Sequence, residues 1–284
     1  MLIILDVLLI AVVLIALLIT SYTDLKTREV PDWISYVVVV LAVLFRLLGA
    51  LDSGQWSYFW YGLLFGGIAF VLGLIMYYTK QWGGGDAKLL IGFGVVFATA
   101  PITHVPGTFL LSLGINILVI GALYGIAASL VIAIRQPKVF QQQYRRLQSY
   151  PKIIIMKRLA FGAALALLLV AFAVDSIGRL LVLGAAFVIC LYPYVFQVLK
   201  AVEEGCMIKT ISSTQLTEGD WLVDVNLRKK FHIPAWGIEQ KHIAALHRAK
   251  IKQVLVKEGI PFVPALLLAV LATLLLGNII PLQF

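Results

Sequence analysis

Two aspartates, Asp24 and Asp86, stand where long apolar runs of this chain meet short polar segments. Carboxylates are rare and costly at the edge of a bilayer, so residues in such places are candidates for function. Two carboxyl groups can divide acid and base roles: an ionised group activates water and a protonated group polarises a carbonyl. The pair therefore predicts acid–base chemistry beside the membrane.

The second aspartate follows a glycine run. Asp86 comes after Gly83, Gly84 and Gly85, and Lys88 stands two residues further on. Glycines permit positive φ, so we expect a sharp backbone turn here, with Asp86 capping free N–H groups at the start of a helix. A capped helix after a flexible turn is the purely structural interpretation of this motif. A glycine-rich turn can also bind phosphate, but the run lacks the Walker spacing and follows a membrane span.

The sequence around the first aspartate is less distinctive than the glycine run before the second. Asp24 shares its polar stretch with Lys26, Arg28, Glu29 and Asp32. Considered by itself, it would be a surface charge in a loop. Its pairing with the glycine-flanked aspartate is what favours a catalytic role.

The composition predicts a polytopic, all-α membrane protein. Hydrophobic residues make up 61% of the chain and charged residues only 13%, unlike an ordinary soluble domain. The two cysteines, Cys190 and Cys206, have no metal-site or disulfide spacing. A spanning helix needs about 20 apolar residues, and hydropathy predicts eight spans near 2–20, 33–51, 57–79, 88–103, 107–134, 158–175, 178–199 and 261–281. The first segment lacks the marks of a cleaved signal, so we interpret it as a permanent span.

The distribution of basic residues predicts the orientation. With the N-terminus outside, the inner regions are 21–32, 80–87, 135–157 and 200–260. If the boundary residues Lys88 and Arg158 are included, these regions hold all 23 Lys and Arg residues except Arg46 and Arg179. This bias follows the positive-inside rule, and it places both aspartates at the cytoplasmic face of the plasma membrane. The net charge of +9 is thereby explained without a nucleic-acid partner.

The polar segments divide the chain into parts. Within 200–260, strand-like stretches at Ile208–Ser212 and Trp221–Val225 flank a Gly219-Asp220 turn, and Gly237–Lys252 has loosely helical spacing. We expect a small cytoplasmic α+β insert that packs on the membrane part. The expected organisation is a catalytic membrane core at 1–134, a basic cytoplasmic loop at 135–157, two spans in 158–199, the insert at 200–260 and a last span in 261–284.

The two motifs together resemble a known family. Residues 83–88 fit Gly-x-Gly-Asp-x-Lys, and residues 23–32 resemble Asp-Leu-basic-x-basic-x-aliphatic-Pro-Asn/Asp. Occurring in this order and at span edges, they resemble the GxGD membrane aspartyl proteases in their prepilin-peptidase branch. The chain is most similar to the archaeal prepilin and preflagellin (archaellin) peptidases, with the resemblance densest over residues 20–100.

The resemblance implies roles for individual residues. It makes Asp24 and Asp86 the catalytic dyad, and it implies an endopeptidase that removes the basic leader of precursors with class III signal peptides. No cofactor or metal is expected, and methylation is not expected because the paired cysteines of bacterial members are missing. The other motif positions are Gly83, Gly84, Gly85, Lys88, Thr23, Lys26, Pro31 and Asp32.

Two weaker assignments concern Glu29 and Pro264. With Asp32, Glu29 is a candidate for attracting the basic leader. Val263-Pro264-Ala265-Leu266 is similar to a Pro-Ala-Leu element that presenilin-type relatives place near their catalytic centre, although a proline that starts a helix explains it equally well.

Two other functions stay open on the sequence. A transporter could use the same carboxylates to bind protons or cations, although transport sites usually lie near the midplane between repeats. A non-enzymatic assembly scaffold would leave the glycine–aspartate pairing unexplained. Cleavage of a leader-bearing, membrane-embedded precursor or proton-coupled uptake would separate these functions.

Overall fold

A computed structural model describes residues 2–79, 82–99, 107–234 and 237–277. The chain is an all-α polytopic membrane protein with a small three-stranded sheet. In the described residues, six helices are long and apolar enough to cross a membrane. They are α1 (Leu2–Thr27), α2 (Asp32–Ser53), α3 (Trp56–Tyr78), α5 (Thr108–Arg135), α7 (Pro151–Val170) and α8 (Ser176–Ala201), the last continuing through the π-helix Val202–Cys206.

The predicted count of eight spans is not confirmed. The segments expected at 88–103 and 261–281 form the shorter helices α4 (Gly84–Val96) and α11 (Val263–Leu276), of 13 and 14 residues. At about 1.5 Å per residue each is ~20 Å long, less than the ~30 Å of a hydrocarbon core. Residues 100–103 and 278–281 of the expected spans lie outside the described part.

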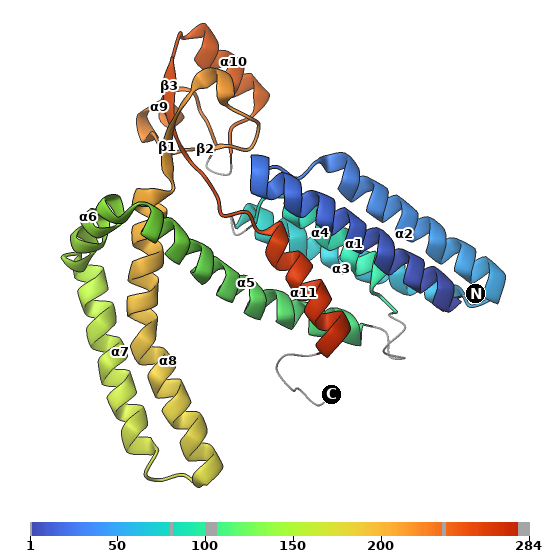
Figure 1. The fold of residues 1–284 in the computed structure, drawn as a ribbon, viewed down its shortest axis with the longest axis horizontal. Coiled ribbons are helices and arrows are strands. Elements are labelled where there is room, and N and C mark those ends of the chain that lie inside the picture. Colours follow the sequence, from blue (N-terminus) through green and yellow to red (C-terminus); the bar gives the residue numbers. More distant parts are fainter. Residues whose placement is uncertain (1, 80–81, 100–106, 235–236, 278–284) are drawn as a thin grey trace.

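The two short helices are enclosed by long ones. Helix α4 packs against α2 and α3, and α11 lies between α1 and α5 (Figure 1). Helices α3 and α4 approach closely where Gly66, Gly73 and Gly94 leave no room for a side chain. The largest hydrophobic cluster joins α1, α2, α4, α5 and α11, with Leu9, Leu17, Leu89, Phe93, Phe97, Leu113 and Leu266 at its centre.

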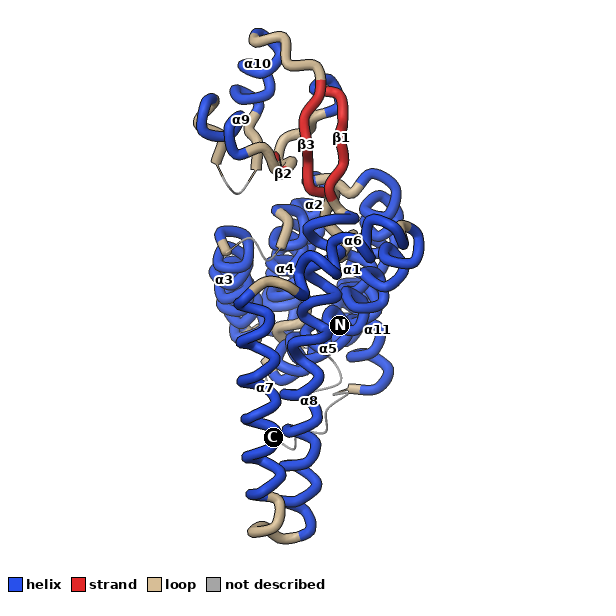
Figure 2. The backbone as a smooth tube through the Cα atoms, turned by 90° about the vertical axis from the view of Figure 1, so that its left-hand side faces the viewer, coloured by secondary structure: helices blue, strands red, loops and turns tan. Residues whose placement is uncertain are grey.

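Helices α7 and α8 form a separate hairpin. They pack along each other and extend away from the bundle (Figures 1 and 2). At the closed end Asp175 accepts a hydrogen bond from the Gly178 N–H at 3.1 Å and so caps α8. At the other end the hairpin joins α6 (Pro137–Gln148), a short basic helix that begins with proline, as is favourable at a helix start.

The insert folds around its own apolar cluster. The sheet order is β1 (Ile208–Ser212), β3 (Gln253–Lys257), β2 (Trp221–Leu222), with β3 antiparallel to both neighbours. The predicted strand at Ile208–Ser212 is confirmed, whereas the second expected strand is only two residues long. Two short helices, α9 (Val225–Lys230) and α10 (Gln240–Arg248), and a 3-10 turn at Ser213–Gln215 complete it. The expected turn is present, with Gly219 at φ 98°.

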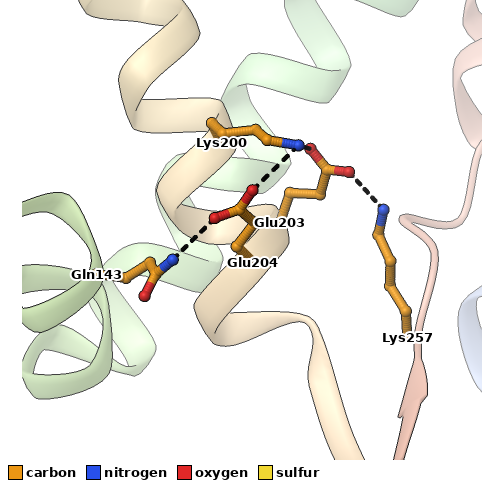
Figure 3. A network of polar contacts seen from close by, with 5 residues as sticks. All are labelled: Gln143, Lys200, Glu203, Glu204 and Lys257. Carbon is orange, nitrogen blue, oxygen red and sulfur yellow. Dashed lines mark hydrogen bonds and ion pairs between the residues drawn. The ribbon is translucent and has the colours of Figure 1, made fainter. Parts of the chain in front are cut away.

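A polar network ties the insert to the root of the hairpin (Figure 3). Glu203 accepts hydrogen bonds from Lys200, at 3.2 Å, and from Lys257 of β3. Glu204 pairs with Lys200 at 3.3 Å and accepts a bond from Gln143 of α6 at 2.9 Å. Four elements thus meet at one cluster: α8, the π-helix Val202–Cys206, α6 and β3.

Candidate active site

Asp24 lies in the last turn of α1 and is buried, with 6% of its surface exposed. Its Oδ2 accepts a hydrogen bond from the Val263 N–H at 2.9 Å, and the Phe262 N–H also acts on the carboxylate. These N–H groups stand at the start of α11, where a helix has unsatisfied donors and a partial positive charge. The carboxylate is therefore held by a helix that lies 239 positions further along the chain.

Asp86 lies in the first turn of α4. Its Oδ2 accepts a hydrogen bond from the Gly83 N–H at 3.2 Å, so the expected cap at the helix start is present. The positive φ that glycine permits is not adopted: Gly83 is extended, with φ −69°, and neither Gly84 nor Gly85 has a positive φ. Of the three glycines, Gly85 is the one that is needed for space.

Gly85 explains that need for space. A Cβ at this position would overlap Val30, which lies in the link between α1 and α2. The glycine motif and the first motif therefore touch through a backbone that carries no side chain. Gly84 stands beside the Tyr77 ring, at 3.6 Å for an added Cβ.

An ion pair joins the two motifs a second time. Lys88 Nζ lies 2.6 Å from Asp32 Oδ1 and 5.7 Å from the centre of the Tyr36 ring. Pro31 directly precedes α2, whose first residue is Asp32. Asp32 is exposed, but its charge is paired with Lys88, which weakens its assignment to leader binding.

The carboxyl groups of Asp24 and Asp86 interact electrostatically. Burial raises the pKa of Asp86 to about 7, the charge of Asp24 adds to the rise, and the hydrogen bond from Gly83 opposes it. A negative charge on Asp24 therefore makes ionisation of Asp86 less favourable.

Arg28 connects this region to the insert. It has φ 59°, a conformation unusual for a residue with a side chain, and it turns the chain sharply after α1. Its guanidinium donates to the Gly259 carbonyl and lies 3.5 Å from Glu258 Oε2. Both acceptors belong to the link that leads from β3 into α11. Arg28 therefore joins the end of α1, which carries Asp24, to the segment that leads to its donor Val263.

Other predicted motif residues point elsewhere. Thr23 donates to the Thr20 carbonyl of its own helix at 3.0 Å, and Lys26 is exposed with its Nζ over the Tyr22 ring. Glu29 is exposed, and its charge acts on Asp220 of the insert. The structure brings none of these side chains to the two carboxylates.

Several neighbours of the site were not predicted from the sequence. Phe262 packs against Trp82 at 5.5 Å between ring centres, just before α11 and α4 begin. Tyr124 of α5 lies near enough to Asp24 for the carboxylate charge to act on its phenol. Pro264 stands in the first turn of α11, directly after the donor Val263. Hydropathy predicted a helix here, but only the Pro-Ala-Leu resemblance connected it with the catalytic centre.

Comparison with known proteins supports the same two motifs. Residues 11–134 match the type IV leader peptidase family. This match spans α1 to α5, including both aspartates, and it supports the resemblance seen in the sequence. The segments from α6 to α11 lie outside it.

Curated relatives carry consistent names. The chain is 33% identical over 82 residues to a preflagellin peptidase of Methanococcus maripaludis, covering 29% of this chain and 35% of that protein. It is 32% identical over 89 residues to a prepilin peptidase of Methanothermobacter thermautotrophicus, covering 31% and 23% respectively. The matched part thus spans about a third or less of the length of these relatives. No solved structure matches the chain.

Proposed function

We propose that this protein is a membrane aspartyl endopeptidase that removes the leader of prepilin- or preflagellin-like precursors. The observation that carries the proposal is the meeting of Asp24 and Asp86 at one end of the bundle, where each caps the start of a short helix. The match of residues 11–134 to the type IV leader peptidase family supports it. Relatives named preflagellin and prepilin peptidase supply the substrate class.

The chemistry follows from the two environments. The protonated carboxyl donates a hydrogen bond to the scissile carbonyl, while the ionised one takes a proton from the attacking water. Asp24 receives backbone N–H groups at the start of α11, which stabilise its negative charge. The raised pKa of Asp86 keeps a proton near neutral pH. We therefore assign Asp24 as the base and Asp86 as the acid in the first step.

The proposed site lies at the end of the bundle that faces the insert, because Asp24, the 28–31 link and the start of α11 all meet there. In the orientation predicted from the basic residues, this end is cytoplasmic. A precursor whose basic leader lies in the cytoplasm and whose apolar stretch lies in the bilayer would present their junction at this depth. Cleavage at that junction is the expected reaction.

The proposal is tested with membrane vesicles that contain the full-length protein. A precursor with a basic leader followed by an apolar helix should be cut at the junction, with the product identified by mass spectrometry. A precursor whose leader lysines and arginines are replaced by glutamine serves as the matched substrate control. Absence of cleavage, together with proton-coupled uptake that depends on Asp24 and Asp86, would instead support the transporter, which the comparisons do not favour.

A further inference from the structure

Arg46 is a fully buried charge in the bundle. It lies in α2, toward the end of that helix opposite to the proposed site. Its side chain has no exposed surface, although it lies in α2 among apolar helices. It stands seven residues before Ser53, the end of α2, which at about 1.5 Å per residue is ~10 Å inside that end. A charge at such a place is strongly disfavoured unless its donors are all engaged.

The donors of Arg46 converge on the last turn of α4. Its Nε donates to the Val95 carbonyl and its Nη2 to the Val96 carbonyl at 2.9 Å. Its Nη1 donates to Thr99 Oγ1 at 2.8 Å, just beyond the helix, and to the Tyr58 carbonyl at 2.9 Å. The last carbonyls of a helix have no partner within it and carry a partial negative charge. Arg46 supplies both the hydrogen bonds and the positive charge that this end lacks.

The same guanidinium is braced from two other helices. It lies 4.5 Å from the centre of the Tyr58 ring on α3, and the Tyr58 hydroxyl donates to Asp6 Oδ1 of α1 at 2.6 Å. The charges of Arg46 and Asp6 also interact. Gly62 of α3 leaves the channel for the side chain, because a Cβ there would overlap Arg46 Cδ. Four helices thus fix one guanidinium.

We propose that Arg46 is a positioning residue that sets the depth of α4 and so places Asp86 opposite Asp24. The link is mechanical: α4 is a single short helix with Asp86 in its first turn and Arg46 bound at its last. Its length fixes the distance between the two ends, so a shift at the bound end moves the carboxylate. The test of this inference by enzyme activity rests on the proposed peptidase function. The test by the distance between positions 24 and 86 does not.

The sharpest test displaces Arg46 without removing it. Gly62→Ala adds a methyl group against the side chain, and Gly67→Ala, on the same helix and facing open space, is the matched control. We expect Gly62→Ala to lower kcat for precursor cleavage by about 100-fold, since an error of ~1 Å in a catalytic site has this effect. KM should change little, and Gly67→Ala should behave like the parent.

A second readout does not depend on activity. In a Cys190→Ala, Cys206→Ala background, cysteines at positions 24 and 86 are joined with bis-methanethiosulfonate reagents of graded length. The shortest reagent that links them reports the separation of the two sites. We expect Gly62→Ala to require a longer reagent than the parent or Gly67→Ala. If the parent does not cleave precursors, the proposed function fails while this measurement still decides the role of Arg46.

Substitutions of the group itself complete the test. Arg46→Met removes the charge and the donors, whereas Arg46→Lys keeps the charge with fewer donors. The kcat of Arg46→Lys should therefore lie between that of the parent and that of Arg46→Met. Thr99→Val removes one acceptor with little change of shape, so it should shift kcat slightly in the same direction. Arg179→Met, at a membrane arginine that binds the Ala171 carbonyl in the separate hairpin, is the control. Parental kcat and parental linking in folded Gly62→Ala and Thr99→Val would overturn the proposal.

Discussion

At the scale of residues, Asp24 and Asp86 are held in unlike ways. Asp24 is bound by N–H groups from a distant helix, whereas Asp86 binds the N–H of Gly83, three residues before it. Their positions at polar edges and the two motifs could be predicted from the sequence, because both signals are local. The donor Val263 could not, since nothing near Asp24 in the chain indicates a partner 239 positions away.

The raised pKa of Asp86 predicts how activity depends on pH. Below about pH 7 the carboxyl keeps its proton and can serve as the acid, and above this value both carboxyls ionise and the acid is lost. We expect kcat for precursor cleavage to fall as the pH rises through about 7, measured on purified protein in proteoliposomes. An activity that stays constant up to pH 9 would contradict a proton shared by this pair.

At the scale of elements, two short helices present their first turns to the site. Helix α4 is bound at its far end by Arg46, and α11 is bound at its far end by Asn116, which donates to Thr273 Oγ1 at 2.9 Å and to the Gly277 carbonyl at 2.7 Å. Hydropathy indicated both segments but overestimated their lengths, because apolar residues continue past each helix end. The N-terminal ends, which matter for the chemistry, depend on tertiary contacts.

The start of α11 offers a test of its contact with Asp24. Val263→Pro removes the N–H that binds the carboxylate at the first helical position, where the φ of proline suits the helix. It also requires Phe262, at ψ −21°, to move toward an extended conformation. Val263→Ala keeps the N–H and removes the buried side chain. We expect the proline variant to lose about tenfold or more in kcat, corresponding to a hydrogen bond to a charged group of about 1.5–3 kcal/mol. Equal kcat in both variants would show that this bond has no role.

At the scale of the whole molecule, the insert and the bundle meet beside the proposed site. Arg28 binds the link between β3 and α11, and Lys257 of β3 binds Glu203 at the root of the hairpin. The presence of the insert and the strand β1 could be predicted from composition and alternation. Strand β3 was not predicted, since its apolar run Val254–Val256 is short and its pairing with β1 joins segments far apart in the sequence.

The predicted orientation can be measured on intact cells. Single cysteines are placed at Lys230 in the insert and at Asp52 near the opposite end of α2, both exposed positions, in the Cys190→Ala, Cys206→Ala background. A membrane-impermeant maleimide should label the cysteine at position 52 in intact cells and the one at position 230 only after the cells are opened. The reverse pattern would place the proposed site on the outer face.

The most direct measurement is single-turnover cleavage of a leader-bearing precursor by the purified protein and by its Asp24→Asn and Asp86→Asn variants. Asp52→Asn, at an exposed carboxylate near the other end of α2, is the matched control. We predict that each dyad variant loses about 10²–10⁴-fold in rate, the usual contribution of general acid–base catalysis, and that Asp52→Asn cleaves at the parental rate. Parental cleavage by either dyad variant would contradict the assignment of Asp24 and Asp86 as the catalytic pair.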